Sequence, residues 1–505
     1  MFKVTMLILL SCLMTAPWIQ AQESNEGLVA EGDAAAKIED KSEAEWLLVG
    51  DQLVNEKKYT EALLAYKSAY ETIVERFRGR KFKEPVKPRF MTRPELQEYM
   101  LKEFKREIAP NEMRFMDRTL KVFGFAPMEL DVEETLLSLY TEEVAGFYNP
   151  RTKEIFLIQE KRKKGSTIGL FKKLIGISEF NKDEQKTTLA HEMTHALADQ
   201  HFDLKTLGEA AEHNDDMALA VSALIEGEAT LLMLGEMFSD NHDKDAIWDI
   251  RSAQVDATFK FAAGAAMVFG GRTMRKAPAI FRETLMFPYH KGTVFVVHLG
   301  RNSDWSRIDR AFKDPPISTE QILHPEKYIG ERDHPTAIDF PSSQEEIGDQ
   351  WDLLGHNSVG ELQLRILLSR QRDVLDAAAG WDGDRFEVYE NKDGRLGLAW
   401  YLVWDSEKDA AEFIASYRNH NGIRLMVDGK EQLYEEWDGT GDKQLEEALG
   451  RADQSWRLKL DGGVNVVVQQ GADVWVVEGF DDRETSLVLN NLRRAKKAPL
   501  QLKIR

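Results

Sequence analysis

Two histidines and a glutamate near the middle of the chain have the types and spacing of a metal-assisted hydrolytic site. The segment 188–197 reads TLAHEMTHAL, and no proline interrupts it. On a helix, His191 and His195 are one turn apart and project from the same side, so their imidazoles can bind one tetrahedral zinc ion. Glu192 lies beside the first histidine, where its carboxylate can take a proton from a water molecule on the metal and hand it to a leaving amine.

The residues around this HExxH string make a chance occurrence less plausible. The string alone is expected in about 2% of chains of this length. Here Met193, Thr194 and Ala196 are uncharged, and Leu189 and Leu197 are apolar. Such a pattern is typical of a helix that is packed into a core and presents only its ligands to a cleft. The alternative interpretation is a helix with two histidines on a buried face and no metal.

The motif resembles that of the zincin peptidases, and a second segment is similar to the gluzincins among them. ALIEGEATLLM, residues 223–233, resembles the helix on which gluzincins carry a glutamate ligand, and EGEA matches the EG-x-A string of aminopeptidase N relatives. This resemblance implies one zinc ion bound by His191, His195 and Glu226. The interval between the two segments is longer in this chain than in those enzymes. The chain also resembles uncharacterised bacterial exported proteins that share HE..HAL.DQHFDL, EGEAT and STEQILHPEKY, over roughly residues 90–340.

Two other residues compete with Glu226 for the place of third ligand. His201 stands ten residues after the first histidine, the offset of the third histidine in metzincins. Those enzymes have a glycine three residues after the second ligand, whereas this chain has Ala198, a strong helix former. In a continuous helix, His201 would lie about 240° round the axis from His195. Glu228 would lie about 200° round its helix from Glu226, so the two glutamates cannot face the same ion.

Neighbouring residues are expected to support the site. Ala223 and Gly227 would let the Glu226 helix approach the HExxH helix closely, and Thr230, one turn further on, could support the ligand by hydrogen bonding. A tyrosine or histidine that stabilises the oxyanion is also expected in such an enzyme. Each candidate for this role is, taken alone, more often a structural hydrogen-bonding residue. The candidates are Tyr148, Tyr289, His290 and His324.

Hydrophobic periodicity predicts an α+β protein with a mainly helical, zincin-like catalytic domain over residues 91–341. Helices are expected at 184–201 and 215–237. In zincins, the strand before the first ligand helix is the edge to which an extended substrate adds. KEIFLI, residues 153–158, could be that edge or an ordinary hairpin strand. The lysine-rich segment 161–173 is predicted to be a solvated loop.

The flanking segments have different patterns. Residues 46–90 resemble a single tetratricopeptide-like helical hairpin with a connector, which cannot bury its own apolar face and is expected to pack on the next domain. Residues 342–505 are predicted to hold a helical stretch over 342–375 and then a small α+β domain. Its expected strands and helices are 385–390, 396–404, 406–417, 464–469, 473–480 and 485–494.

Composition and the N-terminus indicate the class of protein. The 505 residues are 43% hydrophobic, which excludes a wholly disordered chain, and the formal net charge of -20 argues against a nucleic-acid partner. Lys3 followed by the apolar run Met6–Met14 predicts a secretory signal peptide over residues 1–21, with an acidic flexible linker over 22–45. The run is too short for a transmembrane helix, and no later run reaches about 18 apolar residues. Soluble export to the periplasm or medium is favoured over a lipoprotein anchored through Cys12.

These patterns predict an exported zinc metallopeptidase that acts on a peptide or protein substrate. One alternative is a catalytically inactive zinc-binding scaffold of the cell envelope, which binds protein partners through the hairpin and the C-terminal domain. Another is a structural exported protein with a chance motif. Substrate, cleavage mode, oligomeric state and any role of residues 22–90 as a pro-segment do not follow from the sequence.

Overall fold

A computed structural model confirms an α+β protein. The predicted signal peptide, Cys12, all but the end of the predicted linker and the predicted lysine-rich loop lie outside the residues that it describes. The described residues are 41–56, 58–143, 146–158, 181–239, 243–269, 272–301, 304–369, 374–424, 435–436, 443–449, 452–460 and 463–502.

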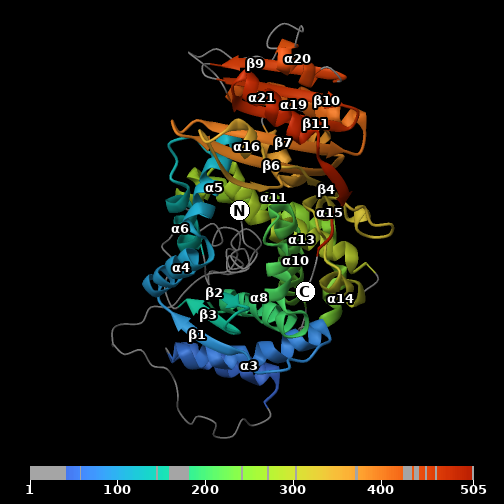
Figure 1. Ribbon diagram of the computed structural model, residues 1–505. Helices are drawn as coiled ribbons and strands as arrows, with labels where there is room; N and C mark the ends of the chain where they lie inside the picture. The colour runs from blue at the N-terminus through green and yellow to red at the C-terminus, as the bar shows by residue number, and fades with distance from the viewer. Residues whose placement is uncertain are drawn as a thin grey trace.

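Helices α2 (Glu43–Asn55) and α3 (Tyr59–Arg78) form a hairpin at the end of the molecule where α3 is drawn in blue (Figure 1). Gly79, in the left-handed conformation that ends many helices, terminates α3. The hairpin does not stand apart from the rest of the protein. The Tyr70 hydroxyl donates a hydrogen bond to Glu236 on a central helix, and the apolar face of α3 belongs to the main hydrophobic core.

A small three-stranded sheet and three helices come next. In the sheet, β3 is central: it pairs with β1 in parallel and with β2 in antiparallel orientation. Of the two alternatives for KEIFLI, the substrate edge is therefore wrong and the hairpin strand is confirmed, because a tight turn folds β2 back along one side of that strand and β1 occupies the other. The edge strand beside the HExxH helix is β2. The elements are β1 (Lys87–Met91), α4 (Arg93–Glu107), α5 (Pro110–Val122), α6 (Val132–Glu143), β2 (Gly146–Asn149) and β3 (Glu154–Ile158).

Helices dominate the middle of the chain, and both helices predicted there are present. Figure 1 shows α8 and α10 at the centre of the molecule, between the hairpin and the C-terminal sheet. The helical elements are α8 (Asn181–Phe202), α9 (Leu204–Ala211), α10 (Asp215–Phe238), η2 (Lys244–Asp249), α11 (Ser252–Phe269), α12 (Arg272–Lys276), α13 (Ala279–Leu299), α14 (Ser306–Lys313), α15 (Thr319–Leu323) and η3 (Pro325–Lys327).

Helix α10 is the core helix of the fold. By length and composition it could cross a membrane, but its most apolar stretch is entirely buried by the surrounding elements, which accounts for its composition. Its small residues do not face α8 as expected. A Cβ on Gly227 would lie 2.3 Å from the backbone of Gly292 on α13, and a Cβ on Gly292 would lie 2.1 Å from the carbonyl oxygen of Ala223. The close approach that these residues allow is therefore between α10 and α13.

The C-terminal part is built on a seven-stranded sheet in the order β5-β6-β7-β11-β10-β9-β8. The predicted helical stretch over 342–375 is wrong in part, since residues 351–357 form β5, whose pairing with β6 overrides the local helical pattern. A second, two-stranded sheet pairs β12 with β4. The elements are β4 (Thr336–Asp339), α16 (Gln344–Ile347), β5 (Trp351–Asn357), α17 (Gly360–Leu367), α18 (Val374–Ala378), β6 (Trp381–Asn391), β7 (Leu396–Trp404), α19 (Glu407–Arg424), β8 (Glu435–Glu436), α20 (Lys443–Leu449), β9 (Gln454–Leu460), β10 (Gly463–Gln470), β11 (Asp473–Phe480), α21 (Asp482–Leu492) and β12 (Lys496–Pro499).

One buried carboxylate, that of Asp384 on β6, fixes the start of α17 against the C-terminal sheet. Helix α17 in turn packs against α10 and α13, so this carboxylate links the sheet to the central helices. Its five hydrogen-bond donors are the indole N–H groups of Trp381 and Trp400, the Ser358 hydroxyl, and the backbone N–H groups of Val359 and Gly360.

Candidate metal centre

Helices α8 and α10 bring three side chains to one point. His191 and His195, one turn apart on α8, face Glu226 on α10. The Nε2 atom of His191 lies 3.0 Å from that of His195 and 3.1 Å from Oε2 of Glu226. The third separation, from His195 Nε2 to the same carboxylate oxygen, is 3.3 Å. The two imidazole planes are nearly perpendicular, at 87°.

This triangle fits a zinc ion. A tetrahedral zinc ion bonded to nitrogen and oxygen at about 2.0–2.2 Å places its ligand atoms about 3.3–3.6 Å apart. The three separations reach the lower end of that range and fall a few tenths of an ångström below it. Two imidazoles and one carboxylate are also a donor set that zinc uses in catalytic sites, where three protein ligands are the rule.

Burial changes the pKa of all three groups. His191, His195 and Glu226 are each no more than 2% exposed. Burial lowers the pKa of both histidines, so their imidazoles stay neutral and keep a lone pair for a metal. Burial also raises the pKa of Glu226 to about 7, and the nearby charge of Glu192 adds to this effect. A divalent ion at the three atoms would offset the cost of burying that carboxylate.

Two further atoms of this group lack a protein partner. Among the described residues, neither Nδ1 of His191 nor Oε1 of Glu226 makes a hydrogen bond, although both atoms are buried. Buried polar atoms of this kind cost free energy. Coordination of an ion by the Glu226 carboxylate would compensate for one of them. Thr230 is buried one turn away, but its hydroxyl donates to no described residue, so the expected hydrogen bond to Glu226 is not formed.

Strand β2 holds the carboxylate of Glu192, the predicted base. The backbone N–H of Tyr148 donates to Oε2 of Glu192 over 2.7 Å. The Tyr148 hydroxyl points elsewhere and donates to Oδ2 of Asp199 over 2.6 Å. Tyr148 therefore serves the site through its main chain, and its phenol is not directed at the metal ligands. Burial, with the neighbouring Asp199 charge, raises the pKa of that phenol far above its ordinary value.

Of the candidate oxyanion donors, Tyr289 is the one beside the metal ligands. It is buried on α13, and its ring stacks on the His191 ring with centroids 6.1 Å apart. His290, the next residue, instead contacts Asp256 on α11, with His290 Nε2 2.6 Å from a carboxylate oxygen. A helix turns about 100° per residue, so neighbouring side chains diverge in this way.

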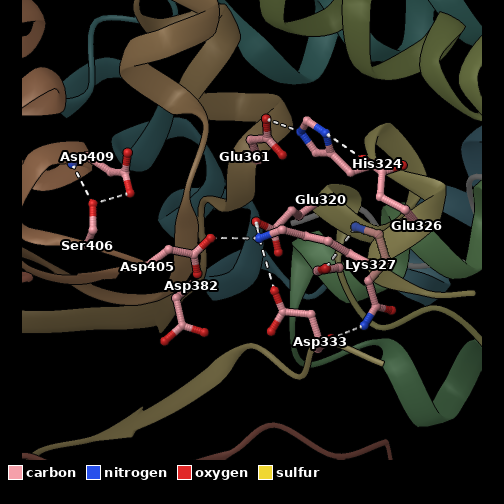
Figure 2. Close-up of polar contacts among 12 residues, drawn as sticks. Glu320, His324, Glu326, Lys327, Asp333, Glu361, Asp382, Asp405, Ser406 and Asp409 are labelled. Atoms are coloured by element: carbon pink, nitrogen blue, oxygen red, sulfur yellow. Dashed lines mark hydrogen bonds and ion pairs between the residues drawn. The ribbon is translucent and has the colours of Figure 1, made fainter. Parts of the chain in front are cut away.

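His324 lies outside the metal centre as well. Its Nε2 atom is 3.1 Å from Oε1 of Glu361 on α17, as Figure 2 shows. The same view shows Lys327 among carboxylates from different parts of the chain. The Lys327 ammonium lies 2.6 Å from Glu320, 3.0 Å from Asp333 and 2.8 Å from Asp405. These carboxylates could by themselves hold a metal ion, but the lysine supplies the positive charge.

The two competing third ligands are placed away from the metal centre. Glu228 is buried and forms an ion pair with Arg78 of the hairpin, with 2.5 Å between Nε and Oε1. His201 Nε2 contacts the backbone carbonyl oxygen of Lys81, 2.9 Å away. Both residues join the central helices to the hairpin region. Within the described chain, Glu226 is therefore the carboxylate that forms a possible metal-binding group with His191 and His195.

Sequence reasoning missed Asp199. It lies four residues after His195 on the same stripe of α8 and is 3% exposed. Its spacing was a usable signal, because a carboxylate at that offset must lie near the histidines on a continuous helix. Its partners on the β2–β3 hairpin could not be read from the sequence.

The comparisons with known proteins concern the C-terminal part. A family model described as "Domain of unknown function (DUF8575)" matches residues 351–489, which run from β5 into α21. That match leaves the metal centre outside it. No curated protein and no solved structure matches the chain.

Proposed function

We propose that the protein is a zinc-dependent metallopeptidase of gluzincin type. The observation that carries this proposal is the convergence of two histidine nitrogens and one glutamate oxygen from α8 and α10, within 3.0–3.3 Å of one another. In the proposal, His191, His195 and Glu226 bind one zinc ion. The substrate is a peptide or protein, and the N-terminal pattern supports export.

The proposal gives each of these side chains a role in hydrolysis. Zinc, when bound, supplies a Lewis acid that polarises a peptide carbonyl and lowers the pKa of a water molecule. Glu192 takes the proton from water through its carboxylate and delivers it to the leaving nitrogen. The Tyr148 N–H holds one oxygen of that carboxylate by a hydrogen bond. The proposal assigns the role of donor to the developing oxyanion to Tyr289, because its ring stacks on that of His191.

Metal content and hydrolysis are tested separately. We expect the purified protein to contain one zinc ion per chain and to cleave an unfolded, casein-like substrate in a chelator-sensitive way. Glu192→Gln should keep its zinc and lose about 10²–10⁴-fold in kcat, the usual contribution of a general base. Equal activity in Glu192→Gln would contradict the mechanism.

Glu228 provides a matched control for the third ligand. Glu226→Gln and Glu228→Gln each remove one buried charge from the same helix, two residues apart. Zinc affinity should fall in Glu226→Gln and stay unchanged in folded Glu228→Gln, as checked by circular dichroism. The reverse result would overturn the ligand assignment. Zinc in the wild type without cleavage across a broad peptide library would instead favour the inactive scaffold.

A further inference from the structure

We propose that Asp199 is a positioning residue for the catalytic base: it ties strand β2 to α8 through Tyr148 and Lys153, and thereby holds the Tyr148 N–H on Glu192. This inference rests on the proposed function for its catalytic consequence. The tether itself is a property of the fold that can be measured without activity.

The contacts of Asp199 account for its burial. Its Oδ2 atom accepts hydrogen bonds from the Tyr148 hydroxyl and the Lys153 ammonium, each over 2.6 Å. Its Oδ1 atom accepts one from the backbone N–H of Leu204 at the start of α9, over 3.0 Å. A buried carboxylate needs such partners, and two of the three come from the β2–β3 hairpin.

The turn of that hairpin is held tightly. The Asn149 side chain accepts hydrogen bonds from the backbone N–H groups of Arg151 and Thr152. Lys153 follows with a φ of 58°, in the left-handed region that non-glycine residues rarely adopt. The ion pair with Asp199 is one interaction that compensates for this strain.

Tyr148 consequently touches α8 at two points. Its N–H binds Glu192 and its hydroxyl binds Asp199, seven residues or about 10 Å further along the helix. Two attachments along one helix prevent the strand from sliding or rotating over it. With the phenol detached, the amide could drift from the Glu192 carboxylate, which would then sample orientations unsuited to proton transfer.

Removal of the phenol tests this tether. Tyr148→Phe keeps the ring, the amide and the other contacts of Asp199. We expect its zinc content and KM to match the wild type, its kcat to fall about tenfold, and the amides of 146–149 to exchange hydrogen several-fold faster. Asp199→Asn, which can still accept from the phenol, should retain more activity than Asp199→Ala.

Tyr99→Phe is the matched control. The Tyr99 hydroxyl accepts a hydrogen bond from Asn149 on the same strand, and it makes no contact with Asp199. Its kcat and the exchange at 146–149 should equal those of the wild type. Unchanged kcat and exchange in Tyr148→Phe, or equal losses in both variants, would overturn the proposal. If the wild type proves inactive, the peptidase proposal fails, and the exchange data still decide whether the tether exists.

Discussion

The contact between α10 and α13 offers the sharpest test of the packing around the metal centre. Replacement of Gly292 by alanine adds one methyl group, which would lie 2.1 Å from the carbonyl oxygen of Ala223 and 2.8 Å from its carbonyl carbon. Ordinary contact begins at 3.4 Å, so the two helices would have to separate by about 1 Å. Both partners are main chain, so a side-chain rotation cannot relieve the clash.

The expected magnitude follows from two opposing terms. Alanine gains about 1 kcal/mol over glycine in a helix interior. Overpacking of a core costs about 1–3 kcal/mol, and the upper end applies here because α10 is buried on all sides. Gly292→Ala should therefore destabilise the protein by about 2 kcal/mol. For a domain of about 150–250 residues, this corresponds to a melting temperature lower by about 4–8 °C.

Gly235→Ala on α10 is the control for this experiment. Its Cβ would lie 2.9 Å from Cβ and Cγ1 of Ile247 and 3.2 Å from its Cα, so η2 would have to move away by about 0.5 Å, which is less than the separation that Gly292→Ala requires. The helix-propensity gain should offset this smaller clash, and we expect a melting temperature close to that of the wild type. Thermal unfolding followed by circular dichroism measures both variants. Gly292→Ala melting at or above the wild type, with Gly235→Ala lower, would refute the reasoning.

Three more variants test charged side chains that join different parts of the fold. Burial alone would raise the pKa of Asp309, but the guanidinium groups of Arg78 and Arg80 outweigh it and hold that pKa below its ordinary value. Its contribution to stability is thus present above the unfolded-state pKa and lost as pH falls through the lower folded-state pKa. Asp309→Asn should destabilise the protein by about 1–2 kcal/mol at pH 7 and not in strong acid, as measured by urea unfolding at both pH values. Lys327→Met removes the ammonium group that lies among three carboxylates (Figure 2) and should lower the melting temperature by a few degrees. Calcium at millimolar concentration should bind these carboxylates and restore part of that loss, whereas no recovery would show that the carboxylates separate without the lysine. Asp384→Ala leaves five buried donors without their acceptor and should cost about 3 kcal/mol or more in urea unfolding, whereas a cost below about 1 kcal/mol would contradict the role given to this carboxylate.

The sequence by itself determined those features that a helix fixes locally. The spacing of His191 and His195 was sufficient to place both imidazoles on one side of α8, because a helix of 3.6 residues per turn leaves no other arrangement. The same geometry separated Glu226 from Glu228, which the structure places on different sides of α10. Helices α8 and α10 and the strands β6, β7, β10 and β11 also followed from hydrophobic periodicity, whereas the long helices α11 and α13 were not predicted.

Only the tertiary structure decided the features that depend on residues far apart in the chain. Strand β3 became central, and β5 formed within a segment that was expected to be helical, because strand pairing is a non-local interaction. Gly227 packs against α13 rather than α8, since the direction of a small residue on a helix that is buried on all sides is not visible in its pattern. The contacts of Tyr148 with Glu192 and Asp199 span 44 and 51 residues, and only the folded chain brings these groups within hydrogen-bonding distance.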